Sequence, residues 1–507
     1  MPETAHRVAM WLALATLAHL VLAAVTGLSP DEAHYALYGA HLDWSYYDHP
    51  PLVGWLQALP VAIGGADVLL RIVPMACWVF AAYGVLRLSD ALHPDTEGGP
   101  GVAARWALAL LLASPITHLL GFALVPDTLL LALTPAVMLV TWRLTGRAGR
   151  AAETLDWVWL GVLLGLAGLA KYTAVFLALG TAIVLFRAHG LRMLRERGVW
   201  LALLIALLMI TPVLWWNARH EWISFAYQLG HAAGQQDWLP RRVALFALVQ
   251  VLGFGVLPLV GVWWSLRRRG GDRKDHEPLI FCAAFAVPAL LAYLYLSGRG
   301  STLPHWAAPS WLALLPAAGA ACARLAGSAR RWLRGLLAWQ FLSCAALGAL
   351  LLTAGVGVER DAQKLTLPGR GDSGAANPFA DLYGWDEAAV RARALAARHG
   401  VAALAVRNWS LASRVAWYAR PLPVRVLPRH YDQFDLWFGA VKPGDSVLLV
   451  DWSRMSFPLP EGPGQFAGCQ WLDSLPVRHA GRQIAHFNFL LCRNWQGSLE
   501  KRRGFPD

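Results

Sequence analysis

The sequence predicts an α-helical integral membrane protein with about eleven transmembrane helices, followed by a smaller soluble α/β domain. Of its 507 residues, 57% are hydrophobic and only 15% are charged, whereas soluble domains carry about 25% charged residues. The charged residues gather in short clusters between long apolar runs, which is typical of a protein embedded in a bilayer. From residue 356 onward the chain becomes polar and rich in proline and glycine.

Eleven apolar segments predict the membrane-spanning helices. Their approximate bounds are 8–27, 68–88, 104–121, 127–143, 156–171, 173–187, 199–217, 243–265, 278–297, 305–324 and 335–355. Clusters of arginine lie between these segments on alternate sides, so the positive-inside rule assigns the arginine-rich side to the cytoplasm. With an odd number of spans, a first loop at 28–67 and a domain at 356–507 then lie outside the cytoplasm. Residues 1–355 form the expected membrane domain.

The net charge of +12 does not indicate nucleic-acid binding, because the arginines alternate with the spans instead of forming one basic stripe. Membrane topology and attraction to anionic lipid account for the excess of positive charge. We therefore expect a lipid bilayer, and no nucleic acid, among the partners of this protein.

The polar segment 356–507 has the pattern of a small α/β domain. Residues Asp386–His399 predict an amphipathic helix. Three short runs predict strands: Val401–Val406, Ser446–Val450 and Ile484–Leu491. Cys469 and Cys492 also lie in this segment, and outside the cytoplasm two such cysteines can form a disulfide. Their spacing alone leaves the pairing open.

The first loop contains the strongest candidate for chemistry. Residues 29–52 include four carboxylates, three histidines and five aromatic side chains beside a segment that lies in lipid. Ionisable groups at such a place are costly and usually serve catalysis or transport. Ser29-Pro30-Asp31-Glu32 also has the form of a helix start, with serine as the N-cap and Glu32 three residues later. Glu32 can complete this cap while Asp31 points into a cavity. The apolar stretch Pro50–Ile63 is too short to span and predicts a helix in the membrane interface.

Asp127 and Lys171 each stand alone in a long apolar stretch, as the only formal charges of residues 106–142 and 157–186. Each charge divides its stretch into two apolar segments. As helices that rise about 1.5 Å per residue, some of these segments are too short to cross the roughly 30 Å hydrocarbon core. We therefore expect the turns at Asp127 and Lys171 to face a cavity. The alternative is an ordinary loop acid and a lysine that snorkels to the interface.

The motifs of the first loop resemble one family. Asp31-Glu32 and the later "LDWSYYDHPPL" resemble the first extracytoplasmic loop of polyprenyl-phosphate-sugar-dependent glycosyltransferases. This family 39 includes the protein O-mannosyltransferases and the bacterial lipid A aminoarabinose transferase. Val125-Pro126-Asp127-Thr128 resembles the "PD" of the family's second outer loop, and Lys171 in "LAKYTAVF" resembles a recurrent family motif. The resemblance implies a GT-C membrane fold with amphipathic helices in the first loop.

The resemblance also implies a reaction. A sugar would move from a polyprenyl-phosphate donor to a lipid A, polysaccharide or protein acceptor, on the periplasmic face of a bacterial inner membrane. In an inverting single displacement, Asp31 would act as the base that takes the proton of the acceptor hydroxyl. Asp127 would be a second catalytic residue that orients the acceptor or the base, or helps to hold a cation.

Further side chains are candidates for binding the substrates. Cations would stabilise the departing phosphate, and first-loop groups would contact sugar. The candidates are Lys171, Arg71, Arg299, Glu32, Asp48, His49, Tyr47 and His305. The three basic residues could instead be interface anchors. A divalent metal cation is a possible cofactor, with Glu32, His34, His49 and His305 as potential ligands, although their spacing matches no diagnostic metal motif.

Two other classes remain open from the sequence. A transporter or flippase of a lipid-linked sugar would also combine many spans with intramembrane charges, but no internal repeat is found. A noncatalytic glycan-binding relative is the second alternative, and the intact Asp31-Glu32 and Pro126-Asp127 pairs argue against it.

Overall fold

The computed structural model describes residues 2–94, 100–146, 152–233, 237–267, 276–300, 302–353, 377, 379–427, 431–479 and 481–497. Contacts between residues divide the chain into two units. The helical unit comprises Met1–Val21, Asp43–Leu56 and Arg71–Leu347, and the C-terminal unit comprises Leu22–Leu42, Gln57–Leu70 and Gly348–Asp507. The expected boundary between residues 355 and 356 lies outside the described residues. The grouping of two first-loop segments with the C-terminal unit was not predicted.

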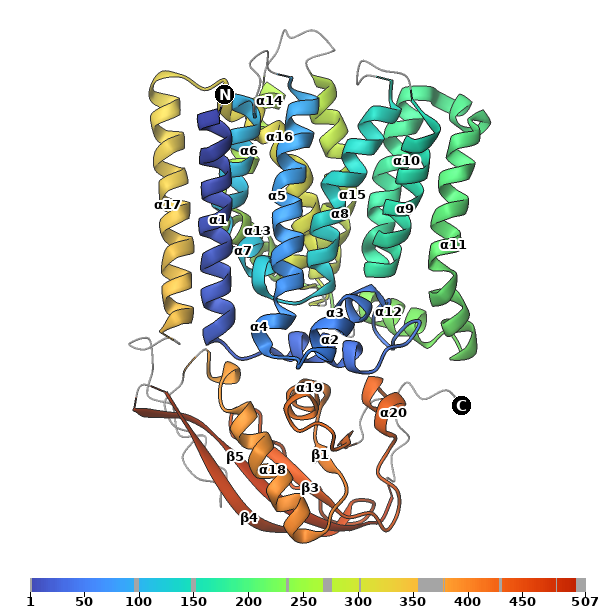
Figure 1. Ribbon diagram of the computed structural model, residues 1–507, viewed down its shortest axis with the longest axis vertical. Helices are drawn as coiled ribbons and strands as arrows, with labels where there is room; N and C mark the ends of the chain where they lie inside the picture. Colours follow the sequence, from blue (N-terminus) through green and yellow to red (C-terminus); the bar gives the residue numbers. More distant parts are fainter. Residues whose placement is uncertain are drawn as a thin grey trace. The chain divides into compact units, whose positions relative to one another are not determined.

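The helical unit contains long helices that run side by side, together with shorter helices (Figure 1). In chain order they are α1 (Pro2–Val25), α5 (Ile72–Leu92), α6 (Val102–Leu112), α7 (Pro115–Phe122), α8 (Pro126–Leu144), α9 (Thr154–Ala170), α10 (Val175–His189), α11 (Arg197–Arg219), α12 (Ile223–Ala233), α13 (Pro240–Phe254), α14 (Leu257–Arg267), α15 (Glu277–Ser297), α16 (Ala308–Ala323) and α17 (Gly327–Leu352). Short helices η1 (Tyr172–Ala174), η2 (Gly190–Arg195) and η4 (Pro304–Ala307) connect some of them. The last residues of α1 belong to the C-terminal unit, and α3 (Leu52–Ala62) continues from one unit into the other.

Each of the eleven predicted spans coincides with helix in the described residues. Among these residues, eight helices are long and apolar enough to cross a membrane, and two bent pairs raise the number to ten. The remaining predicted span is α9, an apolar helix of 17 residues. The chain therefore has the helices of a multi-pass membrane protein.

Two segments predicted as single helices are bent. The axes of α6 and α7 differ by 74°, and those of α13 and α14 by 96°. At the first bend, Ser114 caps a new helix by accepting a hydrogen bond from the backbone N–H of Thr117, and Pro115 occupies the first turn. At the second bend, Gly255 has a φ of +87°, a conformation that favours glycine.

The C-terminal unit is built on a five-stranded sheet with the order β2-β1-β3-β5-β4. Its strands are β1 (Leu404–Val406), β2 (Val424–Val426), β3 (Val447–Trp452), β4 (Phe466–His479) and β5 (Arg482–Trp495). Strand β1 pairs in parallel with β2 and β3, while β5 pairs antiparallel with β3 and β4. The helices of this unit are α2 (Pro30–Ala40), α4 (Asp67–Leu70), η5 (Ala380–Leu382), α18 (Trp385–His399), α19 (Trp409–Tyr418) and α20 (Gln433–Phe438).

First-loop residues form part of the core of the C-terminal unit. Side chains alternate across β1, so that Leu404 and Val406 join one apolar cluster while Ala403 and Ala405 join another. The first cluster is covered by α18 and α19, and it includes Leu28 together with residues of α2. Helix α2 is therefore buried against the sheet domain rather than standing alone.

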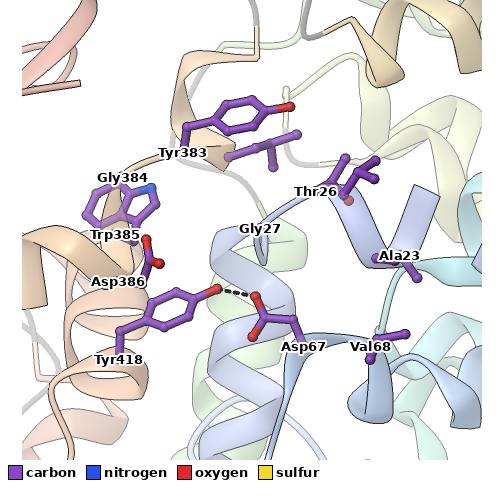
Figure 2. A pocket seen from close by; sticks show the side chains of 13 residues that line it. Ala23, Thr26, Gly27, Asp67, Val68, Tyr383, Gly384, Trp385, Asp386 and Tyr418 are labelled. Carbon is purple, nitrogen blue, oxygen red and sulfur yellow. Dashed lines mark hydrogen bonds between the residues drawn. The ribbon is translucent and has the colours of Figure 1, made fainter. Parts of the chain in front are cut away.

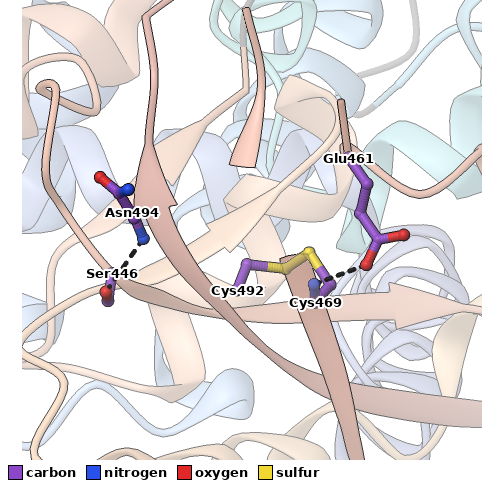
Figure 3. The surroundings of a disulfide bond; sticks show 5 residues. All are labelled: Ser446, Glu461, Cys469, Cys492 and Asn494. Carbon is purple, nitrogen blue, oxygen red and sulfur yellow. Dashed lines mark hydrogen bonds between the residues drawn. A yellow bond between two sulfur atoms is a disulfide. The ribbon is translucent and has the colours of Figure 1, made fainter. Parts of the chain in front are cut away.

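The predicted helix and the three predicted strands of this unit are present as α18, β1, β3 and β5. The stretch predicted as an interfacial helix is also helical, as α3. Strands β2 and β4 and helices α19 and α20 were not predicted. The disulfide that the sequence left open is present: Cys469 of β4 is bonded to Cys492, its partner on β5 (Figure 3).

This disulfide leads to a prediction about thiol content. Without reductant, the denatured chain should expose four alkylatable thiols, Cys77, Cys282, Cys322 and Cys344, and reduction should expose all six. Cys469→Ser should lower the free energy of unfolding of the C-terminal unit by about 2–4 kcal/mol, because the unfolded chain gains freedom. Mass spectrometry and thermal unfolding measure the two effects, with Cys344→Ser as the control. Six reactive thiols before reduction would contradict the prediction.

Candidate active site

A buried ion pair joins the two lone charges of the membrane domain. Asp127 lies in the first turn of α8, directly after Pro126, and Lys171 directly follows the last residue of α9. The Lys171 Nζ atom donates to both carboxylate oxygens of Asp127 at 2.7 Å. The residues are only 2% and 5% exposed. The sequence singled out both residues but did not predict that they bind each other.

A third segment of the chain, η4, contributes two residues that contact this ion pair. The Nε2 atom of His305, in η4, lies 3.5 Å from Asp127 Oδ2. The next residue, Trp306, places its ring centroid 4.9 Å from Lys171 Nζ, within the range of a cation–π contact. Tyr293 of α15 packs against the same tryptophan, with ring centroids 6.3 Å apart. We call Asp127, Lys171, His305 and Trp306 the membrane cluster.

The part of the first loop that belongs to the helical unit is fixed by α11 and α12. The Asp43 carboxylate accepts a hydrogen bond from Trp216 Nε1 at 2.9 Å, and the Tyr46 carbonyl accepts one from Ser224 Oγ at 2.7 Å. The Tyr47 ring lies 4.8 Å from that of Tyr227.

Two more predicted residues of this segment have neighbours in the helical unit. The backbone carbonyl of Asp48 accepts a hydrogen bond from Gln228. His49 interacts electrostatically with Asp127. His49, a first-loop residue, therefore lies within electrostatic range of the membrane cluster.

The other two predicted basic residues occupy different surroundings. Arg71 precedes α5, is 1% exposed, and holds its guanidinium 5.7 Å from the ring centroid of Phe122. Arg299 is half-buried in the turn after α15, where its backbone N–H donates to the Leu296 carbonyl. Phosphate binding by these two residues remains a prediction.

The predicted helix cap at Glu32 is confirmed. The Glu32 Oε2 atom accepts hydrogen bonds from Ser29 N and Ser29 Oγ, both at 3.0 Å, and Ser29 Oγ accepts one from Glu32 N at 3.4 Å. Glu32 is buried, whereas the neighbouring Asp31 is half-buried. The cap therefore fixes the first turn of α2, which carries Asp31.

Sequence reasoning missed a buried arginine that interacts with Asp31. Arg414 of α19 is 1% exposed, lies 3.8 Å from the ring centroid of Trp385, and donates to the Asp381 carbonyl at 2.7 Å. Burial lowers the pKa of Arg414 to about 10, while the charges of Asp381 and Asp31 oppose this shift. The guanidinium therefore stays protonated at neutral pH. The available signal was a single arginine within the otherwise uncharged stretch "LASRVAWY".

Two of the potential metal ligands, Glu32 and His34, contact other groups of the protein. The Glu32 carboxylate serves the helix cap. His34 is buried among the rings of Tyr35, Tyr38, Trp409, Phe434 and Trp437. In the part of the chain that the structure describes, no three His, Cys, Asp or Glu side chains are arranged to hold a metal ion.

Comparisons with known proteins identify the fold of this membrane protein as GT-C. A family model described as dolichyl-phosphate-mannose-protein mannosyltransferase matches residues 48–216. The lipid A galacturonosyltransferase RgtD of Rhizobium johnstonii is 24% identical over 292 residues, or 56% of this chain and 58% of RgtD. The match thus spans little more than half the length of this curated relative.

Solved structures show the same fold. ArnT from Cupriavidus metallidurans in the apo state superposes with a TM-score of 0.59 at 16% identity, covering 88% of this chain and 93% of ArnT. ArnT bound to undecaprenyl phosphate gives a TM-score of 0.61 at 15% identity, covering 96% and 98%. The resemblance to polyprenyl-phosphate-sugar glycosyltransferases and the GT-C fold are both confirmed.

The Asp127–Lys171 pair leads to a prediction about stability. Asp127→Asn or Lys171→Met alone should each lower the free energy of unfolding by about 3–5 kcal/mol, because each leaves a buried charge without its partner. The double variant should lose much less than the sum of the two. Unfolding of the full chain in mixed detergent micelles measures the three values.

The control is the exposed pair Arg187–Glu277, whose side chains are 43% and 19% exposed. Its double-mutant cycle, Arg187→Met with Glu277→Gln, should give a coupling of about 1 kcal/mol or less. Additive losses for Asp127 and Lys171 would contradict the interpretation of a mutually dependent pair.

Proposed function

We propose that this protein is a membrane glycosyltransferase that moves a sugar from a polyprenyl-phosphate donor to an acceptor on the periplasmic face of a bacterial inner membrane. The observation that carries the proposal is the membrane cluster, a buried carboxylate, ammonium and imidazole held together in an apolar helix bundle. Ionisable groups at such a place are functional by default. The name of the matching family model and the undecaprenyl phosphate bound to ArnT support a lipid-phosphate donor.

A lipid-linked donor does not require a nucleotide-binding fold. The sequence has a Gly-x-Gly-x-x-Gly string at residues 369–374, but it follows Leu367-Pro368 and does not directly follow a predicted strand, which is the context of a dinucleotide-binding fingerprint. A donor with a polyprenyl tail can enter from the bilayer and needs only its phosphate and sugar to be recognised.

The proposed reaction is a single inverting displacement with Asp31 as the general base. The acceptor oxygen attacks the anomeric carbon, and its proton passes to the Asp31 carboxylate. The bond between the anomeric carbon and the phosphate oxygen breaks, and its electron pair leaves with the polyprenyl phosphate. The capped first turn of α2 holds Asp31 in one backbone conformation, and Arg414 supplies a nearby positive charge that favours the ionised base.

The membrane cluster is proposed to bind the donor phosphate. A lysine ammonium has three N–H donors, and two of those on Lys171 go to the two oxygens of Asp127. The remaining N–H can donate to a phosphate oxygen while the carboxylate keeps the ammonium in place. His305, which lies close to the same carboxylate, can supply a second donor. The same proposal includes substrate binding by five further residues: Arg71, Arg299, Glu32, Asp48 and Tyr47.

The test uses purified full-length protein in proteoliposomes with undecaprenyl-phosphate-linked hexoses, hexuronic acids and aminopentoses, and lipid A as acceptor. Asp31→Asn should reduce transfer about 10²- to 10⁴-fold, because the base is lost, while the thermal unfolding midpoint stays near that of the unaltered protein. Asp237→Asn, in an exposed loop, is the matched carboxylate control and should keep full activity.

The same vesicles distinguish the rival class. A transporter or flippase would move the labelled donor across the bilayer without forming a glycosylated product. Translocation without transfer, or undiminished transfer by Asp31→Asn, would contradict the proposal.

A further inference from the structure

A cavity of about 380 Å³ lies within the C-terminal unit. Its wall is formed by the end of α1 and the residues after it, by the start of α4, and by the segment that leads into α18 (Figure 2). The lining side chains with polar or aromatic groups include Asp67, Tyr383, Trp385, Asp386 and Tyr418. The residues of the membrane cluster are not part of this wall, so the cavity is a separate feature of the chain.

One side of the cavity is a rigid aromatic wall. Trp385 stacks against the buried guanidinium of Arg414, and its Nε1 atom donates to the Asp381 carbonyl at 2.7 Å. The rings of Trp452 and Phe487 lie 5.4 and 4.8 Å from it. This indole is only 3% exposed and forms the rigid back of the wall. The half-buried ring of Tyr383 is the aromatic surface that a ligand can contact.

Two polar groups at the cavity are already used within the protein. The Tyr418 hydroxyl donates to Asp67 Oδ2 at 2.5 Å and accepts a hydrogen bond from the backbone N–H of Leu28 at 3.2 Å. These bonds tie α19 to α4 and to the chain after α1. They therefore fix the shape of the cavity.

Two other polar groups are available to a ligand. Asp386 is exposed at the start of α18, and Tyr383 is half-buried two residues before the helix. In the residues that the structure describes, neither the Asp386 carboxylate nor the Tyr383 hydroxyl has a hydrogen bond or an ion pair. Burial raises the pKa of Tyr383, so its hydroxyl keeps its proton at neutral pH. The cavity thus offers one anionic acceptor and one phenolic donor.

The side formed by the end of α1 and by Val68 carries small or branched side chains, those of Ala23, Ala24, Val25, Thr26 and Val68. The Thr26 hydroxyl donates to the Leu22 carbonyl at 2.7 Å. The volume is at the lower end of the range of roughly 300–1,000 Å³ that is typical of small-ligand sites. One sugar ring with part of a second would fill it.

The aromatic surface, the carboxylate and the phenolic hydroxyl of the cavity together match a pyranose ring. A pyranose has an apolar C–H face that packs on an aromatic ring, and equatorial hydroxyls that donate to carboxylates. The Asp386 carboxylate repels uronates and phosphates and attracts an amine, since like charges at short range are unfavourable and charge-assisted hydrogen bonds are strong. A neutral or amine-bearing sugar therefore fits better than an acidic one.

We propose that this cavity is a saccharide-binding site for a neutral or amine-bearing pyranose. Its use as a subsite for the acceptor glycan rests on the glycosyltransferase function proposed above. The wall includes the last turn of α1, a candidate membrane span that ends at Val25. The sugar can accordingly come from a glycolipid headgroup or from a soluble glycan.

The test measures sugar binding to the full chain in nanodiscs by saturation-transfer difference NMR, without any donor. Glucosamine and glucose should show saturation transfer, and galacturonic acid should show none. Asp386→Asn should weaken glucosamine binding at least tenfold and remove its advantage over glucose. Ala24→Phe, which adds a ring at an exposed position of the wall, should abolish binding of both sugars. Glu387→Gln, the exposed neighbour of Asp386 outside the wall, is the charge control and should bind as the unaltered protein does.

Three results would overturn the proposal: no binding of any sugar, equal binding of galacturonic acid, or unchanged binding by Ala24→Phe. Asp31→Asn separates this proposal from the enzymatic one, because it should bind glucosamine normally while transfer is lost. Competition by a glucosyl diacylglycerol placed in the nanodisc would assign the site to a glycolipid headgroup. Competition only by soluble oligosaccharides would assign it to a soluble glycan.

Discussion

The ion pair between Asp127 and Lys171 is the constraint on which the arrangement of the helical unit depends. Either charge alone would be costly in an apolar bundle, so the turns that carry them must meet. Asp127 lies at the start of α8 and Lys171 at the end of α9. Each charge therefore sits at the helix end whose dipole favours it, an anion at an N-terminus and a cation at a C-terminus. The pairing fixes the relative depth of the two helices.

The same constraint brings a third segment into place. His305 and Trp306 precede α16 and both contact the pair, one through its imidazole and the other through the face of its indole. Hydrogen bonds and a cation–π contact thus stabilise charged groups that would otherwise be buried among apolar side chains without polar partners. The result is a polar site of fixed geometry within apolar surroundings, which is the basis of the phosphate-binding role proposed for the membrane cluster.

The sequence predicted the parts of the structure that depend on local pattern. The spans follow from long apolar runs, and the cap at Glu32 follows from four consecutive residues. The Asp127–Lys171 contact joins residues 44 positions apart, and the sequence flagged each charge without indicating that they meet. Strand β2 is only three residues long, and in β4 buried and exposed side chains do not alternate regularly. Arg414 resembles an ordinary helix-surface arginine until the rings of Trp385 and Trp452 are placed around it.

The division of the first loop explains why the proposed base needs the C-terminal unit. Helix α2 has 11 residues, and isolated helices shorter than about 12–15 residues are marginal in water. Its stability must come from packing, and eight of its residues are buried. His34 and Tyr38 pack against Trp437 of α20, while Leu37 joins the apolar core beneath the sheet. The sheet domain therefore holds the turn that carries Asp31, and the conformation of this residue depends on the packing of α19 and α20 as well as on its own helix cap.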